Sequence, residues 1–193
     1  MRRFAQLLDI RETTRVLDVG GTPLNWSLLP FRPQVTLLNL PSARPKWPEF
    51  DCVIGDGRRL PFADRSFDVV FSNSVIEHVG SWEDQRRFAD EVLRVGRRYW
   101  VETPNRRFPV EMHMLLPFLH FLPKSWQRGI ARRWTVWEFI TRPSQDHRNA
   151  YIEHYLNDIR LVDARELREL LPGCVVDRER FLGFTKSLTA YLA

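Results

Sequence analysis

Short apolar runs alternate with a clear helical pattern in the first half of the chain. Residues 81–96 carry apolar side chains at helical spacing, with Ser81 as N-cap and Gly96 as the stop. The apolar runs end in polar residues or glycine, as strands buried on both faces of a sheet do. They are residues 15–19, 34–40, 51–54, 67–73 and 98–104. This order predicts a doubly wound, mostly parallel sheet.

The last part of the chain has a different pattern. Residues 164–173 predict a helix closed by Pro-Gly, and the residues after it predict two strands joined at Leu182-Gly183. We therefore predict an α/β fold with a seven-stranded, mostly parallel Rossmann-like sheet and a C-terminal antiparallel hairpin. A helical insert is expected after the fifth strand, over residues 104–150. The length fits a single domain, residues 1–193.

Composition excludes several classes of protein. Apolar residues make up 44% and charged residues 27% of the chain, as in globular proteins. The longest apolar stretch reaches about half of the roughly 20 residues that a membrane helix needs. No signal-peptide pattern stands at the start, which predicts a cytoplasmic location. Cys52 and Cys174 lie far apart, so a disulfide framework and a cysteine-built zinc site are excluded.

Positive charge is concentrated in the predicted insert. Residues 104–150 hold eight Arg and Lys against three Asp and Glu, which equals the net charge of +5 of the whole chain. Aromatic residues are also frequent in this segment. We expect it to select the acceptor molecule and to contact an anionic or amphipathic partner such as a membrane surface. The alternative is a helical cover whose arginines lie over apolar surface without a ligand.

Polar residues and glycines follow four of the predicted strands. Because the carboxyl ends of parallel strands meet at one edge of the sheet, ligands bind there. The residues at these ends are Asp18, Gly20, Gly21, Asn39, Asp56, Gly57, Ser72 and Asn73. The first loop lacks the third glycine of dinucleotide-binding loops, and Pro23 removes a backbone N–H that a phosphate would use. The edge therefore suits a positively charged nucleoside without phosphates.

Three segments of the chain carry a family resemblance. They read VLDVGG, GDGRRLPFADRSFDVVFSNSVIEHV and VETPN, and they lie between Val16 and Asn105. They are similar to the motifs of class I S-adenosylmethionine-dependent methyltransferases, of the bacterial group called methyltransferase type 11. The resemblance implies that the chain binds S-adenosylmethionine and transfers its methyl group.

The resemblance also implies roles for the strand-end residues. Asp18, Gly20 and Gly21 match the motif that holds the methionine part of the cofactor. Asp56, with Gly57 after it, matches the residue that binds the adenine amino group.

Two further strand ends complete the implied cofactor site. Ser72 and Asn73 match the strand end whose backbone faces the methionine amine. Asn39, followed by Leu40, stands where the family usually has Asp or Glu for the ribose hydroxyls. An amide accepts with one oxygen and lacks the strength of a charged acceptor. We therefore expect Asn39→Asp to preserve or tighten cofactor binding.

Candidate catalytic residues follow the fourth and fifth strands. Methyl transfer from a sulfonium mainly requires positioning, and a hydroxyl acceptor also benefits from a general base. His78, and Glu111 with His113, are the candidates, and structural packing is the alternative role for each histidine. Together with Glu77 they resemble the metal site of RNA 3′-end methyltransferases. Ser74 stands where that pattern has a further carboxylate, and we expect no metal.

Three functions from different classes remain open at this point. The first is a methyltransferase for a small-molecule, saccharide or lipid-linked acceptor. The second is an RNA methyltransferase that would use the basic and aromatic insert. The third is a partner subunit that binds S-adenosylmethionine without activity of its own. Because no RNA-binding module is visible, we favour the first and expect no nucleic-acid partner.

Overall fold

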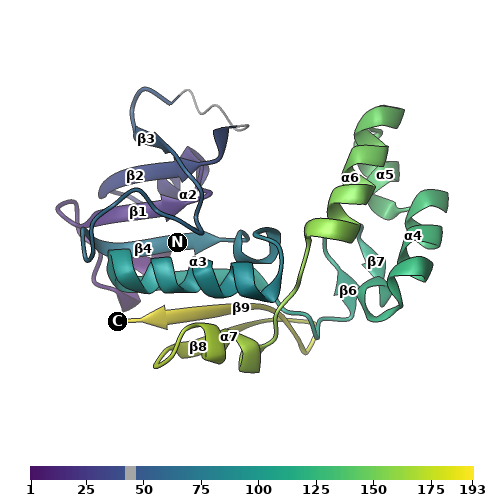
Figure 1. Ribbon diagram of the computed structural model, residues 1–193. Coiled ribbons are helices and arrows are strands. Elements are labelled where there is room, and N and C mark those ends of the chain that lie inside the picture. The colour runs from purple at the N-terminus through teal and green to yellow at the C-terminus, as the bar shows by residue number, and fades with distance from the viewer. Residues whose placement is uncertain (42–46) are drawn as a thin grey trace.

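The chain folds into a sheet lobe and a projecting arm (Figure 1). The computed structural model describes residues 1–41 and 47–193. The sheet lobe contains the central sheet and its covering helices, and the arm comprises residues 106–158. No helix in the described ranges combines the length and the apolar content needed to cross a membrane.

The central sheet has seven strands in the order β3-β2-β1-β4-β5-β9-β8. The first five in the chain are parallel and the last two form an antiparallel hairpin on β5. Their bounds are β1 Arg15–Val19, β2 Gln34–Asn39, β3 Asp51–Ile54, β4 Phe67–Asn73, β5 Gly96–Pro104, β8 Val175–Phe181 and β9 Phe184–Leu192. The predicted fold class and the predicted hairpin at Leu182-Gly183 are confirmed.

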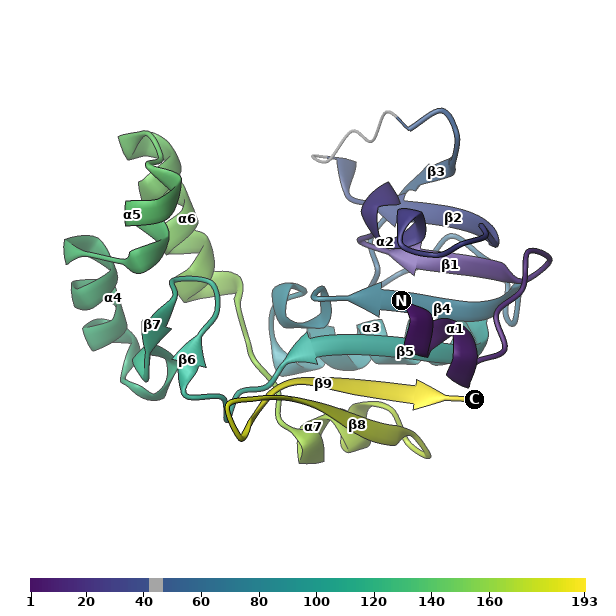
Figure 2. The same cartoon turned by 180° about the vertical axis from the view of Figure 1, so that it is seen from behind.

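Helices cover both faces of the sheet (Figure 2). On one face lie α3 (Trp82–Val95) and α7 (Ala164–Leu170), and on the other lie α1 (Arg2–Leu7) and α2 (Pro23–Ser27). Ser81 caps α3 through a capping box with Asp84, as its sequence predicted. Each face has its own core of buried apolar side chains. The carboxyl edge of the sheet, between these two helical layers, carries the connecting loops.

The helix after β1 has only five residues. Trp26 is buried on it, in edge-on contact with Phe4 and Phe71. Because the helix is this short, the indole of Trp26 lies close to the end of β1 and reaches Asp18. The connection from β3 to β4 contains no helix, and its first residues run along the carboxyl edge.

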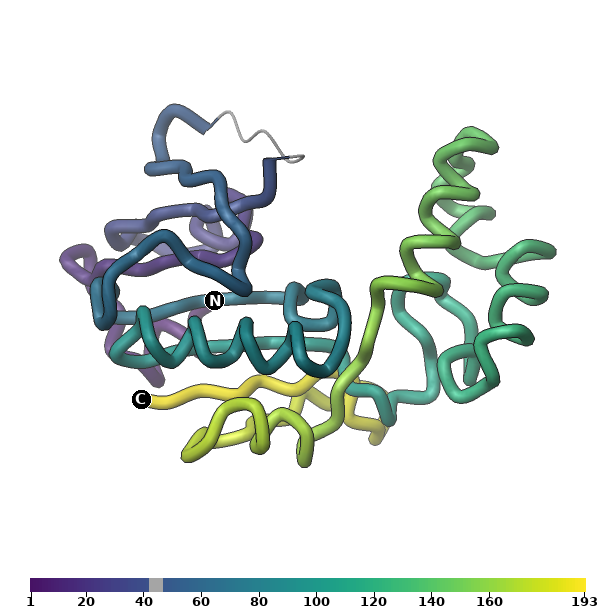
Figure 3. Tube along the Cα trace, in the orientation of Figure 1, coloured from purple at the N-terminus to yellow at the C-terminus, as the bar shows by residue number. Residues whose placement is uncertain are grey.

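The arm contains a two-stranded ribbon and three helices. Their bounds are β6 Val110–Glu111, β7 Leu116–Pro117, α4 Lys124–Arg133, α5 Val136–Thr141 and α6 Gln145–Asp158, with the short 3-10 helix η3 at Leu119–Phe121. Met114, Leu119, Ile152 and Tyr155 belong to a separate small core inside the arm. Two chain segments join the arm to the sheet lobe, one after β5 and one before α7 (Figure 3). The helical part continues past residue 150, to Asp158.

Candidate active site

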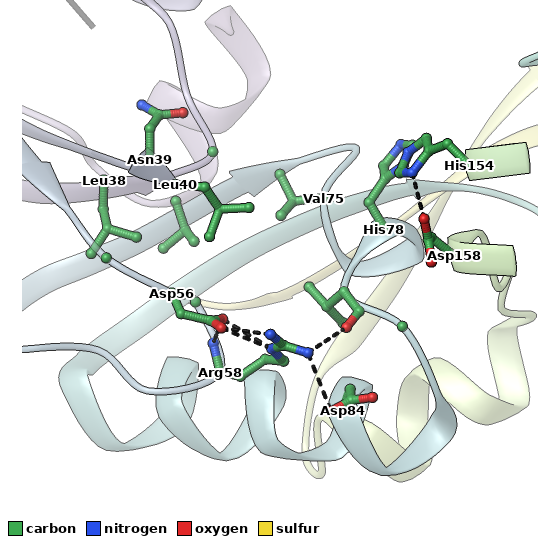
Figure 4. Close-up of a pocket in the computed structure, with 16 residues that line it drawn as sticks. Leu38, Asn39, Leu40, Asp56, Arg58, Val75, His78, Asp84, His154 and Asp158 are labelled. Atoms are coloured by element: carbon green, nitrogen blue, oxygen red, sulfur yellow. Dashed lines mark hydrogen bonds and ion pairs between the residues drawn. The ribbon is translucent and has the colours of Figure 1, made fainter. Parts of the chain in front are cut away.

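A cavity of about 570 Å³ lies at the carboxyl edge of the sheet, between the sheet lobe and the base of the arm (Figure 4). Its volume is in the range of small-molecule sites. Six of the predicted site residues line it: Gly20, Asn39, Leu40, Asp56, Gly57 and His78. The predicted edge is therefore the edge at which the fold forms a cavity.

The glycine loop after β1 has no room for side chains. A Cβ atom on Gly20 would lie 2.5 Å from a methyl carbon of Val75, and the φ angle of Gly20 is +77°. A Cβ atom on Gly21 would lie 1.8 Å from a carboxylate oxygen of Asp18. Both glycines are thus required by close approach of the surrounding chain.

Asp18 lies buried beneath this loop and does not line the cavity. Its Oδ2 accepts a hydrogen bond of 2.8 Å from the indole N–H of Trp26. Its Oδ1 is buried and has no partner in the described part of the chain. Burial raises the pKa of Asp18 to about 7, although the bond from Trp26 works against this. A buried carboxylate with one free oxygen favours a cationic group nearby.

Asn39 lines the cavity and also holds the glycine loop. Its Nδ2 donates a hydrogen bond of 3.0 Å to the carbonyl oxygen of Gly21. This contact reverses our expectation for Asn39→Asp, because an ionised carboxylate would face the Gly21 carbonyl and repel it. We now expect Asn39→Asp to loosen the loop and to weaken cofactor binding, as measured by calorimetry.

Asp56 already has a partner across the floor of the cavity. The Arg58 guanidinium contacts both carboxylate oxygens of Asp56, the shortest contact being 2.6 Å, and this ion pair lowers the pKa of Asp56. Arg58 also donates to the carbonyl oxygen of Val79 and reaches Asp84 at 3.4 Å (Figure 4). A ligand that bonds to Asp56 must therefore share it with Arg58, a residue that our sequence analysis missed.

Two predicted residues on β4 lie outside the cavity lining. Ser72 is fully buried, and Asn73 accepts a hydrogen bond from the hydroxyl of Ser74. Ser74 has a φ angle of +57°, so the backbone turns sharply after the strand. The turn leads directly into the short 3-10 helix η2 (Ile76–His78), which presents His78 to the cavity.

Three histidines meet where the arm joins the sheet lobe. His78 comes from η2, His113 from the turn after β6, and His154 from α6. The Nε2 atoms of His78 and His113 lie 3.4 Å apart. The rings of His78 and His154 are parallel, with centroids 5.6 Å apart. We call this group the histidine cluster.

Two carboxylates, one buried and one exposed, orient His113 and His154 of the histidine cluster. Glu111 is fully buried, and its Oε1 lies 2.6 Å from Nδ1 of His113 while its Oε2 accepts from the backbone N–H of Met114. If Nδ1 of His113 donates to Glu111, then Nε2 of His113 carries a lone pair and faces His78. His154 is held in a similar way by Asp158, at 2.8 Å. Glu111 and His113 were predicted to act together, and the structure brings them into contact.

His78 is neutral at physiological pH. Burial, together with His113 and His154, lowers its pKa to about 4. Burial raises the pKa of the neighbouring Glu77 to about 7. One oxygen of Glu77 accepts from the hydroxyl of Thr103, and the other is buried 4.0 Å from Nε2 of His78, without a hydrogen-bond partner within the described ranges. The uncharged imidazole of His78 thus lies beside a carboxylate oxygen of Glu77 that has no hydrogen-bond partner in the described ranges.

A second cavity of about 260 Å³ lies on the other side of the cluster. Glu77 and His113 line it, whereas His78 and His154 line the first cavity. The other walls come mainly from β5 and the β8–β9 hairpin and include several polar side chains: Ser74, Glu102, Thr103, Pro104, Met112, Glu179, Lys186 and Ser187. The histidine cluster thus stands between two cavities.

Three donor atoms in the cluster could hold a divalent metal ion. The free oxygen of Glu77 and one ring nitrogen each from His78 and His113 lie within 4.8 Å of one another. Two imidazoles and a carboxylate form a donor set that first-row metal ions accept. The expectation of a metal-free site stays a prediction.

Sequence reasoning missed the two cavity residues that the arm supplies, His154 and Asp158. A histidine and an aspartate four residues apart on a helix are a recognisable pair, but they lie beyond the predicted insert boundary at residue 150. The predicted boundary at residue 150 also left two acidic residues out of the charge count for the arm. Residues 104–158 hold eight Arg and Lys against five Asp and Glu. Glu153 alone pairs with both Arg128 and Arg132.

The central part of the chain is similar to known proteins. Residues 33–98 match the family described as a methyltransferase domain (Methyltransf_11). A probable S-adenosylmethionine-dependent methyltransferase of Mycolicibacterium smegmatis is 44% identical over 66 residues, which are 33% of this chain and 24% of the relative. The match therefore spans about a quarter of the length of that relative. The glycine loop with its missing third glycine lies outside the family match.

Solved structures share the whole fold. A crystal structure of a SAM-dependent methyltransferase from Methanosarcina mazei covers 94% of this chain, with a TM-score of 0.54 at 13% identity over 92% of that protein. A structure from Rhodobacter sphaeroides, described as a putative Zn-dependent alcohol dehydrogenase, covers 99% of this chain with a TM-score of 0.62. The two sequences are 12% identical, and the match covers 88% of that protein. At such identities the likeness shows the fold alone.

Proposed function

We propose that the chain is a class I S-adenosylmethionine-dependent methyltransferase that methylates a hydroxyl group of a small-molecule, saccharide or lipid-linked acceptor, as the family match, the relative and the shared fold support. The observation that carries the proposal is the histidine cluster between two cavities. One cavity takes the cofactor, and the other takes the acceptor.

The residues around the first cavity fit S-adenosylmethionine. The glycine loop lets a ligand approach the backbone closely, and the free oxygen of Asp18 beneath it favours the positive charge of the cofactor. Asp56 and Gly57 lie where the adenine would bind, with Arg58 shared between Asp56 and Asp84. When bound, the cofactor supplies a methyl group that is already activated on a sulfonium.

The histidine cluster can take up the proton of the acceptor hydroxyl. His78 is neutral at physiological pH, so one of its ring nitrogens carries a lone pair. His113 lies next to it and is held by the buried carboxylate of Glu111, which stabilises a positive charge on the imidazole. Glu111 therefore acts through His113 as a positioning residue.

The second cavity fits a hydroxylated acceptor better than a phosphate. Three carboxylates, Glu77, Glu102 and Glu179, stand in its walls against one cation, Lys186. Burial raises the pKa of Glu102, and Ser187 donates to Glu179. These oxygen atoms can accept hydrogen bonds from hydroxyl groups and would repel a phosphate. A saccharide hydroxyl meets these conditions.

Calorimetry and a labelled-methyl assay test the two halves of the proposal separately. Calorimetry should show binding of S-adenosylmethionine or of S-adenosylhomocysteine, and Asp56→Ala should weaken it by roughly tenfold because a charge-assisted hydrogen bond is lost. Incubation of acceptor extracts with the labelled cofactor should then give a labelled product. A folded protein that releases no heat with either ligand contradicts the cofactor half.

Glu111→Gln tests the role of the histidine cluster. We expect turnover to fall by about 100-fold, since general-base catalysis contributes at least this much, while cofactor affinity stays within about twofold. His147→Asn is the matched control, because His147 lies on the same arm and does not line either cavity. An unchanged rate in Glu111→Gln would remove the histidine cluster from catalysis.

Two other outcomes would replace the proposal. Labelled RNA, bound with a steep dependence on salt, would support the RNA methyltransferase. If the purified chain binds the cofactor but gives no labelled product with any acceptor extract, the result would support a partner subunit without activity of its own. Metal analysis of the purified protein tests the expectation of a metal-free site. Stoichiometric zinc or manganese that is lost in Glu77→Gln would contradict this expectation.

A further inference from the structure

The β8–β9 hairpin ends in an exposed apolar tip. Phe181, Leu182 and Phe184 are exposed by 56%, 82% and 56%, respectively. Because β9 runs antiparallel to β5 and begins at Phe184, the tip lies beyond the carboxyl end of β5. This is the end of the sheet lobe from which the arm departs (Figures 1 and 2). Several large apolar side chains exposed together are typical of an interaction site.

The turn at the tip holds a leucine in a backbone conformation that leucine disfavours. Leu182 has a φ angle of +48° and Gly183 one of +85°. Two-residue hairpin turns with positive φ at both positions favour Asn-Gly, because asparagine tolerates this conformation better than leucine. Leu182 gains no burial in exchange, since it is more exposed than its neighbours at the tip. Folding of the hairpin therefore does not explain this leucine.

A groove beside the tip is rich in arginine. It has a volume of about 450 Å³, and the tip contributes Gly183 and Phe184 to its lining. Its arginines are Arg107, Arg165, Arg168 and Arg178. Asp163 is the acidic residue in the lining, and Arg106 and Arg107 already share its carboxylate.

The charge in this groove is available, unlike most of the charge on the arm. No acidic side chain in the described ranges pairs with Arg165, Arg168 or Arg178. On the arm, by contrast, Glu153 pairs with two arginines and Glu138 with a third. Arg165, Arg168 and Arg178 thus place unpaired positive charge beside the hairpin, outside the predicted insert.

We propose that the hairpin tip inserts into an anionic phospholipid bilayer, with the groove arginines lying over the lipid phosphates. Apolar side chains at the boundary between headgroups and acyl chains, combined with arginines near the surface, are the two forces that hold peripheral proteins on such membranes. A soluble phosphate compound would use the arginines without the tip. An uncharged apolar partner would use the tip without the arginines.

A bilayer at the tip would also bring lipid-linked acceptors to the histidine cluster. Glu179, Lys186 and Ser187 of the same hairpin line the second cavity. The headgroup of a lipid held at the tip would therefore lie near that cavity. This consequence rests on the proposed methyl transfer, whereas the membrane contact itself does not.

Sedimentation of the full chain with vesicles tests the contact. The probes are phosphatidylcholine vesicles with and without phosphatidylglycerol, and we expect binding only to the anionic ones. Leu182→Asn should weaken binding by about tenfold while raising the Tm, because asparagine suits the turn and removes the apolar tip. A loss of binding in this variant cannot be ascribed to unfolding.

Substitution of the groove arginines tests the electrostatic part. Arg165→Gln and Arg178→Gln should each weaken binding roughly fivefold. Arg2→Gln on α1 removes the same charge away from the groove and should leave binding unchanged. Calorimetry with S-adenosylmethionine on each variant should give the parent affinity, so a failure of cofactor binding is seen separately.

Four results would overturn the proposal. The first is that the parent protein shows no preference for anionic vesicles, and the second is that Leu182→Asn binds them fully. The third is that binding is lost only in Arg132→Glu and Arg133→Glu on the arm. The fourth is that the parent binds no vesicles but forms a dimer in light scattering, which Leu182→Asn dissociates. The last result would assign the tip to a second copy of the chain.

Discussion

The two walls of the cavity that we propose for the cofactor are built in different ways. On the sheet side, the chain itself already uses the key polar groups: Trp26 bonds to Asp18, Asn39 to Gly21, and Arg58 to Asp56. On the arm side stand His154 and Asp158 of the arm with His78 of η2, and the neutral ring of His78 keeps a lone pair.

Substitutions in the two walls should therefore have different effects. The sheet wall is fixed by internal bonds before any ligand arrives, so changes there should alter the stability of the fold and cofactor affinity together. The arm wall depends on residues from a segment with a core of its own. Changes there should alter proton affinities and turnover with little effect on the sheet lobe.

Gly21→Ala should have the largest effect on the sheet wall. The added Cβ would overlap the Asp18 carboxylate, which has no space to retreat because it is buried on Trp26. We expect a loss of about 2 kcal/mol in the free energy of unfolding and a loss of cofactor affinity of about 100-fold or more. Denaturant unfolding and calorimetry measure the two effects.

Gly129→Ala is the matched control for this substitution. Gly129 lies in α4 with open space around it, and alanine is the better helix former there. It should stabilise the protein slightly and leave cofactor affinity unchanged. If Gly21→Ala behaved like Gly129→Ala, the sheet wall would not be rigid.

Asp18→Asn should change how stability depends on pH. The pKa of Asp18 is about 7 in the folded chain, above its value of about 3.9 in the unfolded chain, so folding takes up a proton between these values. The stability linked to this proton is full below pH 4 and is lost as the pH rises through 7. Because one pKa unit is worth about 1.4 kcal/mol, the loss amounts to a few kcal/mol.

Denaturant unfolding at several pH values checks this prediction. Asp18→Asn should be more stable than the parent at pH 8 and similar to it at pH 4. Parallel pH profiles for the two proteins would mean that Asp18 is ionised without cost in the folded chain.

His154→Ala tests the arm wall. His154 is one of the groups that lower the pKa of His78, and its ring lies parallel to that of His78. Its removal should raise the pKa of His78 from about 4 toward its ordinary value, as followed by NMR titration of the histidine ring protons. Stability should change by less than about 1 kcal/mol, since His154 is half exposed. A large loss of stability would show that the arm wall is also structural.

Arg58→Ala should give the smallest effect. It frees the Asp56 carboxylate from an ion pair that is about 40% exposed on both sides and therefore weak. We expect cofactor affinity to rise about threefold, because the ligand no longer competes with Arg58 for Asp56. Weaker binding in calorimetry would instead make Arg58 a direct contact of the cofactor.

The sheet and its ligand edge could be predicted because the information is local. Each strand is a short apolar run with a polar end, and parallel strands gather these ends without further assumptions. Arg58 could also have been found, since it lies two residues from Asp56 in a tight turn.

The arm wall could not be predicted in the same way. His78 and His154 are far apart in the chain, and their contact depends on how the small arm core returns α6 to the sheet lobe. The partner of Asp18 was missed for a related reason. Only the one-turn length of α2 brings the Trp26 indole to the end of β1.

The two connections of the arm meet at one point of the sheet lobe. Asn105, just before the arm, pairs with Val162, which follows the last helix of the arm, in an isolated parallel bridge. A segment that leaves and returns at a single point can be exchanged, lengthened or shortened in evolution without shifting the register of any sheet strand. The arm can then diversify among descendants while the carboxyl edge of the sheet is inherited unchanged.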